Sequence, residues 1–309
     1  MDEWWAASEA GMGVGVGVGE SVVGECDGGW WGSVDTWWGD FAGAGRETAG
    51  AVVAAFERAN EQWAAGEGPF DTDPLAGDTN MSRGERGPLP PATEPDWSTW
   101  LARTLRPSHA LPETLFDTTL NDNPTTVRTE AVLPNADGTD RRADLLIFHD
   151  DRAVSIEVKL GDENYAKTAE TVALVEHHYP NYEWTHVLLL PEQQQDALTA
   201  TLDSTTIDTD TERPRLDWPG KPSVRVLYWR DVAVALRSCL VRGACVDAYW
   251  AANAYLLCAS IERRVVGFQT AAVVAELAGP TGIVDLLPTA QRTRLLSKQL
   301  RYLREWVEA

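Results

Sequence analysis

The sequence predicts an α/β protein in which a mixed central sheet is flanked by helices. Three observations support this expectation. Short strand-like runs occupy the middle of the 309-residue chain, segments with helical spacing lie on both sides of them, and hydrophobic residues make up 44% of the sequence, enough for a sizeable core. Before this region we expect an irregular N-terminus rich in glycine and tryptophan, and after it a helical C-terminal extension.

The first 95 residues are expected to contribute little to the core. Residues 1–45 combine six tryptophans with a run that alternates glycine and valine. They predict a poorly packed extension, because glycine loses much entropy on ordering, although tryptophan favours burial. Residues 46–95 are expected to form one helix, from Arg46 through Trp63, and then a linker whose Gly, Pro and Asp residues break helices and strands.

Residues 96–240 hold the predicted core. Asp96 is expected to cap a first helix, and Pro112 followed by Glu113 begins a second, because proline is favoured in the first turn of a helix. Apolar runs then predict five strands, at residues 127–133, 143–148, 153–160, 186–190 and 224–229. Helical spacing and polar composition predict two further helices and one loop, at residues 164–179, 231–240 and 198–222 respectively.

Residues 241–309 are expected to be helical, since apolar residues recur at helical spacing from Val246 to Ile261 and again from Leu296 to Val307. The four cysteines show neither a CxxC pair nor zinc-ligand spacing, which predicts reduced thiols. The chain starts without the basic and apolar regions of a signal peptide, and it lacks a run of about 18 apolar residues. A cytoplasmic protein without a membrane partner is therefore expected.

The charge balance is strongly acidic, with a formal net charge of −21 from 47 acidic and 26 basic residues. The few lysines are Lys159, Lys167, Lys221 and Lys298. This composition predicts a halophilic protein, because at molar salt the repulsion between like charges is screened over about 3 Å. Acidity normally disfavours nucleic acid as a partner, but counterion release contributes little to affinity at molar salt. Nucleic acid is therefore not excluded.

The third predicted strand carries the candidate chemistry. Side chains alternate along a strand, so Ser155, Glu157 and Lys159 share one face. Asp144 begins the preceding strand, and a tight turn at residues 149–152 makes the two strands antiparallel neighbours, which can bring Asp144 close to Glu157. Two carboxylates on adjacent strands suit a hard cation such as Mg²⁺. Lys159 can then orient a water molecule or offset negative charge in a transition state.

Asp144 followed by Glu157-Val158-Lys159 resembles the D…(D/E)xK signature of the PD-(D/E)XK nuclease superfamily. The order of predicted elements over residues 96–240 is similar as well. The resemblance implies a restriction-endonuclease-like core in which Asp144 and Glu157 bind Mg²⁺ or Mn²⁺ and Lys159 assists catalysis. It also implies hydrolysis of nucleic acid, with DNA expected ahead of RNA, and a homodimer as a candidate assembly.

The resemblance implies further site residues. A third acidic metal ligand is usual in this superfamily, and Glu130 on the first strand and Glu113 on the second helix are both candidates, with Glu130 favoured. On the helix after the motif, Lys167 and Tyr179 are candidates to face the substrate, although the Gln-x-x-x-Tyr pattern that is common there is missing.

Alternatives to catalysis stay open. Glu157 and Lys159 can form a solvent-facing ion pair across strands with Arg152 or Asp144. The chain can also be an inactive nuclease-like binding or accessory module in DNA repair or defence. The basic run at residues 292–304 is a candidate nucleic-acid contact, although such a face is more often solvated or salt-bridged.

Overall fold

The structure is a computed structural model that describes residues 29–76, 93–116, 123–136, 138–161, 165–202, 207–208, 214–279 and 290–308. Two compact units divide the chain, Met1–Gly43 and Ala44–Ala309. The second unit contains the sheet and the candidate site.

Helix α2 spans Gly29–Ala64, so the helix expected from Arg46 begins 17 residues earlier (46 minus 29). The predicted irregular N-terminus is therefore wrong from Gly29 onward, and residues 1–28 lie outside the described part of the chain. Residues 29–45 contain glycine but no proline. Glycine costs a helix about 1 kcal/mol per residue, which longer-range packing can offset, whereas proline would end it.

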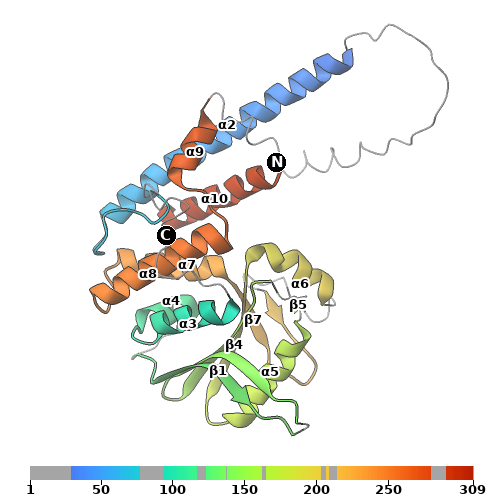
Figure 1. The fold of residues 1–309 in the computed structure, drawn as a ribbon, viewed down its shortest axis with the longest axis vertical. Helices are drawn as coiled ribbons and strands as arrows, with labels where there is room; N and C mark the ends of the chain where they lie inside the picture. The colour runs from blue at the N-terminus through green and yellow to red at the C-terminus, as the bar shows by residue number, and fades with distance from the viewer. Residues whose placement is uncertain are drawn as a thin grey trace, which may run out of the picture. The chain divides into compact units, whose positions relative to one another are not determined.

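A mixed sheet forms the centre of the described core, as expected (Figure 1). Its seven described strands follow the spatial order β1-β2-β3-β4-β7-β6-β5, with β3, β4 and β7 parallel and the other neighbours antiparallel. The strands are β1 (Thr126–Leu133), β2 (Arg141–Phe148), β3 (Arg152–Val158), β4 (Glu183–Leu190), β5 (Ile207–Asp208), β6 (Arg215–Leu216) and β7 (Val224–Tyr228). The two short strands β5 and β6 lie where only a polar loop was expected.

The hairpin between β2 and β3 has the expected antiparallel pairing. The backbone N–H of His149 donates to the carbonyl oxygen of Arg152 at 2.8 Å and closes the turn. Leu145 pairs with Ile156, so the next position along β2, Asp144, is opposite Glu157. The strand expected to reach Leu160 ends at Val158.

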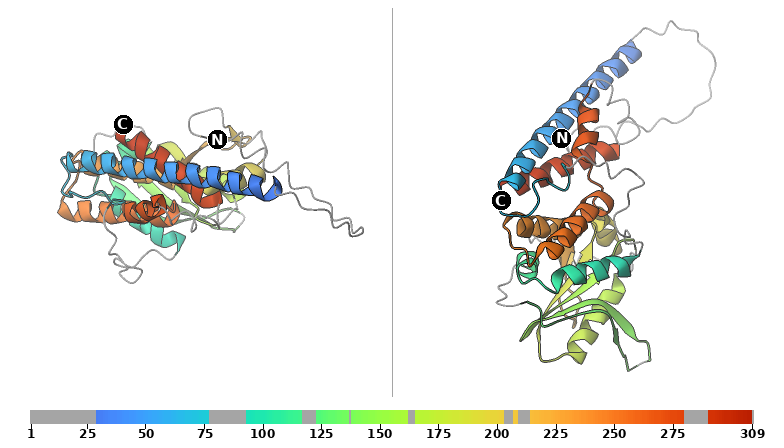
Figure 2. Two further views of the ribbon diagram at one scale, coloured as in Figure 1. Left: turned by 90° about the horizontal axis from the view of Figure 1, so that it is seen from above. Right: turned by 60° about the vertical axis from the view of Figure 1, so that its left-hand side comes forward.

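Helices cover both faces of the sheet. Helix α5 (Ala166–His178) links the parallel strands β3 and β4 and contacts β1 to β4, whereas α3 (Glu94–Leu105) contacts β1 and β2. Figure 2 shows the teal helix α3 on one side of the green strands. The start of α3 corrects the expectation that Asp96 is its cap, because Thr93 occupies the cap position and its N–H donates to the Asp96 carboxylate at 3.0 Å.

The remaining described helices confirm a helical C-terminal part. After β4 come the 3-10 turn η1 (Glu192–Gln194) and α6 (Gln195–Thr201), and α7 (Trp229–Val241), against which α4 (Ala110–Phe116) packs, follows β7. The C-terminal part comprises α8 (Ala248–Ser260), the π-turn η2 (Ile261–Val265), α9 (Ala271–Ala278) and α10 (Ala290–Glu308). None of the helices in the described residues is both long and apolar enough to span a lipid bilayer.

Residues 66–76, the first part of the predicted linker, lack regular secondary structure but pack against these C-terminal helices. Leu75 is fully buried. The indole N–H of Trp63 donates to the backbone carbonyl oxygen of Phe70 at 2.7 Å. The hydroxyl of Tyr255 donates to the backbone carbonyl oxygen of Thr72 at 3.1 Å. This segment therefore belongs to the folded helical part.

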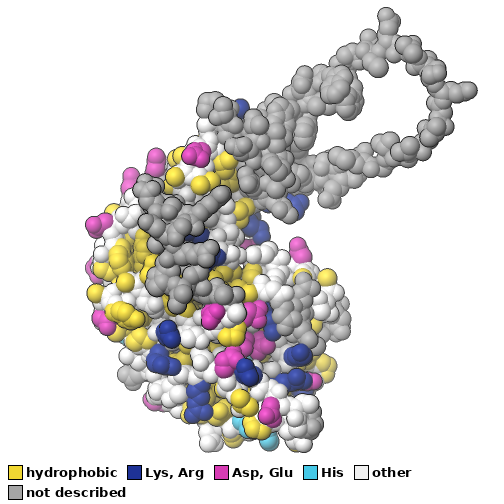
Figure 3. Space-filling model, in the orientation of Figure 1, with side chains coloured by type: hydrophobic (Ala, Val, Ile, Leu, Met, Phe, Trp, Pro, Cys, Tyr) yellow, Lys and Arg dark blue, Asp and Glu magenta, His cyan; other side chains and the backbone are white. Residues whose placement is uncertain are grey.

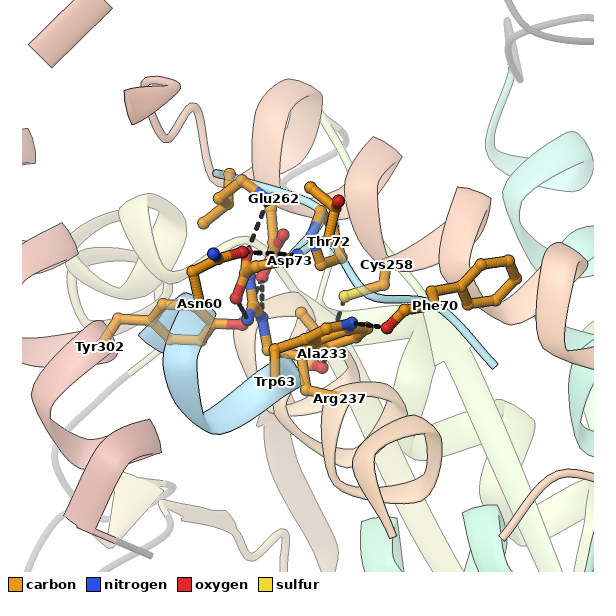
Figure 4. A network of polar contacts seen from close by, with 12 residues as sticks. Asn60, Trp63, Phe70, Thr72, Asp73, Ala233, Arg237, Cys258, Glu262 and Tyr302 are labelled. Carbon is orange, nitrogen blue, oxygen red and sulfur yellow. Dashed lines mark hydrogen bonds and ion pairs between the residues drawn. The ribbon is translucent and has the colours of Figure 1, made fainter. Parts of the chain in front are cut away.

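A buried charged group, the Arg237 centre, joins these segments (Figure 4). Its members Arg237, Asp73, Glu262 and Tyr302 are fully buried. The Arg237 guanidinium donates from both terminal nitrogens to Asp73, at 2.8 Å for the Nη2–Oδ1 bond, and from Nε to Glu262. The Tyr302 hydroxyl donates to the same Glu262 oxygen at 2.6 Å. Arg237 thus connects α7 to residues 66–76, to η2 and to α10.

Aromatic rings enclose the Arg237 guanidinium. The ring of Trp63 lies 5.5 Å from its central carbon, and those of Tyr302 and Trp306 lie 5.6 Å from it. A cation over desolvated aromatic faces gains electrostatic attraction as well as packing. The rings also keep water from the ion pairs, so each charge depends on its protein partners.

Replacing Asp73 by alanine is expected to lower the free energy of unfolding by about 3–5 kcal/mol, because the buried Arg237 charge would lose its bidentate partner. The matched control is Glu183→Ala, which breaks the exposed Arg152–Glu183 pair and should cost about 1 kcal/mol or less. Denaturant unfolding at constant KCl measures both values. Similar losses for the two variants would contradict the structural role of the Arg237 centre.

Candidate active site

The structure brings Asp144, Glu157 and Lys159 together at one end of the β2–β3 hairpin. The Asp144 Oδ2 atom accepts a hydrogen bond from the backbone N–H of Val158 at 2.7 Å. The Lys159 Nζ atom lies 3.2 Å from Glu157 Oε1. Beyond the end of β3, the N–H of Lys159 still donates to the carbonyl oxygen of Leu189 on β4 at 2.8 Å. The backbone of the whole motif is therefore held by neighbouring strands.

This group of charges is largely removed from water. The side chains of Lys159 and Glu157 are 9% and 12% exposed. Burial, followed by the nearby Glu157 charge, raises the pKa of Asp144 from 3.8 to about 7, although the Val158 hydrogen bond and the Lys159 charge oppose the shift. A carboxyl group with such a pKa is only partly ionised at neutral pH, and an added cation beside it would favour the ionised form.

The alternative of a solvent-facing ion pair with Arg152 is wrong. Arg152 pairs with Glu183 at the start of β3 and β4, the end of these strands away from Glu157. The pair between Glu157 and Lys159 lies within one chain segment, and both side chains are mostly buried. A buried pair carries a desolvation cost, so it indicates a specific local role more than a gain in stability.

Of the two candidates for the third acid, Glu130 lies beside Asp144. Its neighbours in β1 pair with the neighbours of Asp144 in β2, and its charge contributes to the raised pKa of Asp144. Glu130 has a positive φ of 53°, a strained backbone conformation for a residue other than glycine, and its carboxylate lies 2.7 Å from the Arg142 guanidinium. Glu113 instead lies on α4, which packs on α7.

The acids do not form a complete three-ligand site. Within the described residues, no three His, Cys, Asp or Glu side chains are grouped so that they could hold a metal ion. Asp144 and Glu157 therefore supply two carboxylates, and the third acid, Glu130, is engaged by Arg142. Any bound cation would have to complete its coordination with water or substrate oxygens.

Glu94 is a residue of the site that the sequence interpretation missed. Its Oε1 atom accepts hydrogen bonds from the backbone N–H groups of Leu160, at 2.6 Å, and Gly161, at 3.3 Å. A carboxylate from the first turn of α3 thus holds the backbone immediately after Lys159. The signal was present in Thr93 and Asp96, whose capping-box spacing places the helix start at Glu94.

Lys167 and Tyr179, the predicted substrate-facing residues, lie at opposite ends of α5. Lys167 is exposed in the first turn, which follows the segment after Lys159. Tyr179 follows the last turn, where its hydroxyl accepts a hydrogen bond from Arg128 at 3.1 Å and its ring packs against Phe148. The structure therefore does not bring Tyr179 to the three motif residues, since the 13 residues of α5 span about 20 Å.

A second polar chain crosses the same face of the sheet. Ser155 Oγ lies 2.6 Å from His186 Nδ1, and His186 Nε2 lies 3.2 Å from Glu176 Oε1. The order of residues is that of a nucleophilic relay. However, Ser155 and His186 are only 5% and 3% exposed in the centre of the sheet, and burial lowers the pKa of His186. We therefore interpret this chain as a structural support of β3.

Comparison with known proteins adds no identification. No family model matches the chain, and searches of curated proteins and of solved structures also find no match. The resemblance to the PD-(D/E)XK superfamily consequently stays a prediction that rests on the motif and on the order of elements.

Replacing Asp144 by asparagine is expected to change how stability depends on pH. Because folding raises the pKa of Asp144, the protonated carboxyl stabilises the folded state fully below about pH 3.8, and this contribution is lost as the pH rises through about 7. Asparagine does not titrate and can still accept the Val158 hydrogen bond. In EDTA, the variant should therefore gain about 2 kcal/mol relative to wild type between pH 5 and pH 8.

Thermal or denaturant unfolding at fixed KCl across this pH range measures the difference. The control is Asp151→Asn, which removes the same charge from the exposed turn of the hairpin. A constant difference between Asp144→Asn and wild type at all pH values would show that folding does not raise the pKa of Asp144.

Proposed function

We propose that the protein is a metal-dependent nuclease that hydrolyses phosphodiester bonds of DNA, with RNA as the second substrate class. The observation that carries the proposal is the placement of Asp144 opposite Glu157, with the Lys159 ammonium 3.2 Å from Glu157. The succession of α3, β1, β2, β3, α5 and β4 supports a restriction-endonuclease-like core, because it agrees with the order that the resemblance implies.

The donor set fits a hard divalent cation. Mg²⁺ prefers carboxylate oxygens and usually keeps several waters, so one or two protein carboxylates and a substrate phosphate can complete its coordination. Asp144 and Glu157 supply such oxygens, and their repulsion contributes to the raised pKa of Asp144, which a cation would relieve. When bound, Mg²⁺ or Mn²⁺ polarises a phosphate oxygen and lowers the pKa of a bound water.

Lys159 supplies the positive charge of the proposed reaction. Its backbone N–H is bound to β4, and Glu94 fixes the two following amide groups, so the ammonium is held on a rigid segment. In this position Lys159 can hold the attacking water by a hydrogen bond, or offset charge that develops on the phosphate oxygens. Its pairing with Glu157 keeps the buried ammonium satisfied before substrate binds.

The distribution of surface charge fits a protein that binds nucleic acid at high salt through short-range contacts. Figure 3 shows acidic and basic side chains interspersed over the lower part of the face in view, without one extended basic surface. Together with the net charge of −21, this arrangement gives little long-range attraction for a polyanion. At molar salt such attraction is screened for every protein, so short-range contacts would decide affinity.

A catalytically inactive binding module is the second candidate. The observation in its favour is that both carboxylates already have protein partners, because Glu157 pairs with Lys159 and Asp144 accepts a hydrogen bond from Val158. The two candidates differ in cation binding. Calorimetric titration with Mn²⁺ at high KCl should show heat and thermal stabilisation for the nuclease, whereas an inactive module that has lost the metal site should show neither.

Cleavage of duplex DNA and of RNA, measured at high KCl with Mg²⁺ or Mn²⁺, tests the function directly. Asp144→Ala and Lys159→Ala should each lower the rate by about 100-fold or more, since each removes charge stabilisation in a desolvated site. The control Asp150→Ala removes a carboxylate from the turn at the other end of the hairpin and should cleave like wild type. Equal cleavage by all four proteins would reject these residues as catalytic.

Glu94 is expected to act on the rate through the backbone after Lys159. Glu94→Ala removes the acceptor for Leu160 and Gly161 and should lower kcat about tenfold, as expected when a catalytic group is misplaced by a fraction of an ångström. Glu94→Gln keeps an acceptor oxygen and should retain most activity. If the glutamine variant is as slow as the alanine variant, the carboxylate charge of Glu94 matters and the backbone explanation is wrong.

A further inference from the structure

Helix α10 is rich in basic residues, in contrast to the rest of the chain. Five of its 19 residues are lysine or arginine, compared with 26 of 309 in the whole sequence, which has a net charge of −21. The five residues are Arg292, Arg294, Lys298, Arg301 and Arg304. Such an enrichment of basic residues in an acidic protein indicates a specific role for this helix.

Three of these residues form a row along the helix. Arg294, Lys298 and Arg301 are separated by four and three positions, so their side chains lie on one face. Arg294 and Arg301 are exposed, whereas Leu296 and Leu303 are buried in the protein. The helix is thus fixed to the protein by its apolar side and presents the basic row outward.

The row begins beside the carboxyl ends of the parallel strands. The Lys298 ammonium lies 3.8 Å from Glu192, which follows β4, and the Arg230 guanidinium, which follows β7, lies 4.0 Å from the same carboxylate. Lys159 follows β3. Because β3, β4 and β7 are parallel, Lys159 and Arg230 both lie at the end of the sheet where the carboxyl ends of these strands meet. Neighbouring strands are about 4.8 Å apart, so two strand spacings separate them by about 10 Å.

The Arg230 and Lys298 side chains are only loosely paired at this end of the sheet. Arg230 and Lys298 share one carboxylate, that of Glu192, at distances that are long for ion pairs. The Lys298 side chain is also 43% exposed to solvent. Loosely paired and partly exposed cations can exchange a carboxylate for a phosphate at little cost.

We propose that Arg294, Lys298 and Arg301, which we name the α10 row, bind the phosphate backbone of DNA together with Arg230, next to the bond that is cleaved. The choice of DNA rests on the proposed function. Phosphates of one strand follow each other every 3.4 Å along the duplex axis, so side chains whose backbones lie about 10 Å apart can contact different phosphates of one strand. The phosphates that follow on the same strand would then contact the basic residues along α10.

Binding of a fluorescently labelled 24-base-pair duplex to the full chain, followed by anisotropy in Ca²⁺ over a KCl series, tests the row separately from cleavage. Arg294→Ala/Arg301→Ala should weaken binding about tenfold at the lowest KCl concentration at which the protein stays folded. The slope of log K against log salt should become shallower by about two, one unit for each lost phosphate contact.

The matched control is Arg128→Ala/Arg152→Ala, which removes the same charge at the opposite end of the sheet and should leave affinity within about twofold and the slope unchanged. The inference is overturned if the α10 variant binds like wild type, if both double variants lose affinity equally, or if wild type does not bind the duplex. Salt-dependent binding through the row without cleavage in Mg²⁺ would reject the proposed function and keep the row.

Discussion

The register between β2 and β3 is the constraint on which the candidate site depends. Side chains alternate along a strand, so a slip of one residue would turn Glu157 and Lys159 to the other face of the sheet, away from Asp144. The hydrogen bond that closes the hairpin at His149 and the one from Val158 to the Asp144 carboxylate fix this register at both ends. The acidic pair is thus a direct result of strand pairing.

The Arg237 centre gives the helical part of the chain a comparable constraint. Arg237 is on the helix that follows β7, and its partners come from residues 66–76, η2 and α10. Because these charges are fully buried, the segments must meet in one arrangement to keep them paired. The same arrangement fixes α10, and with it the basic row, beside the end of the sheet that carries Lys159.

The sequence was most informative where local patterns decide the structure. Strand alternation and the turn at residues 149–152 predicted the hairpin and the shared face of Glu157 and Lys159, and the structure confirms both. Features that depend on distant segments were missed. The packing of residues 66–76 depends on Arg237, and the reach of Glu94 to Leu160 depends on how α3 crosses the sheet. Neither relation leaves a periodic pattern in the sequence.

The central claim is that Asp144 and Glu157 share one divalent cation next to Lys159. A crystal structure of the protein with Mn²⁺ and its anomalous difference map is the most direct measurement. The account predicts one strong peak about 2.1 Å from an oxygen of each carboxylate, with the Lys159 ammonium beside the coordinated water or phosphate oxygens. A map without a peak between the two carboxylates, with Lys159 still bonded to Glu157, would contradict it.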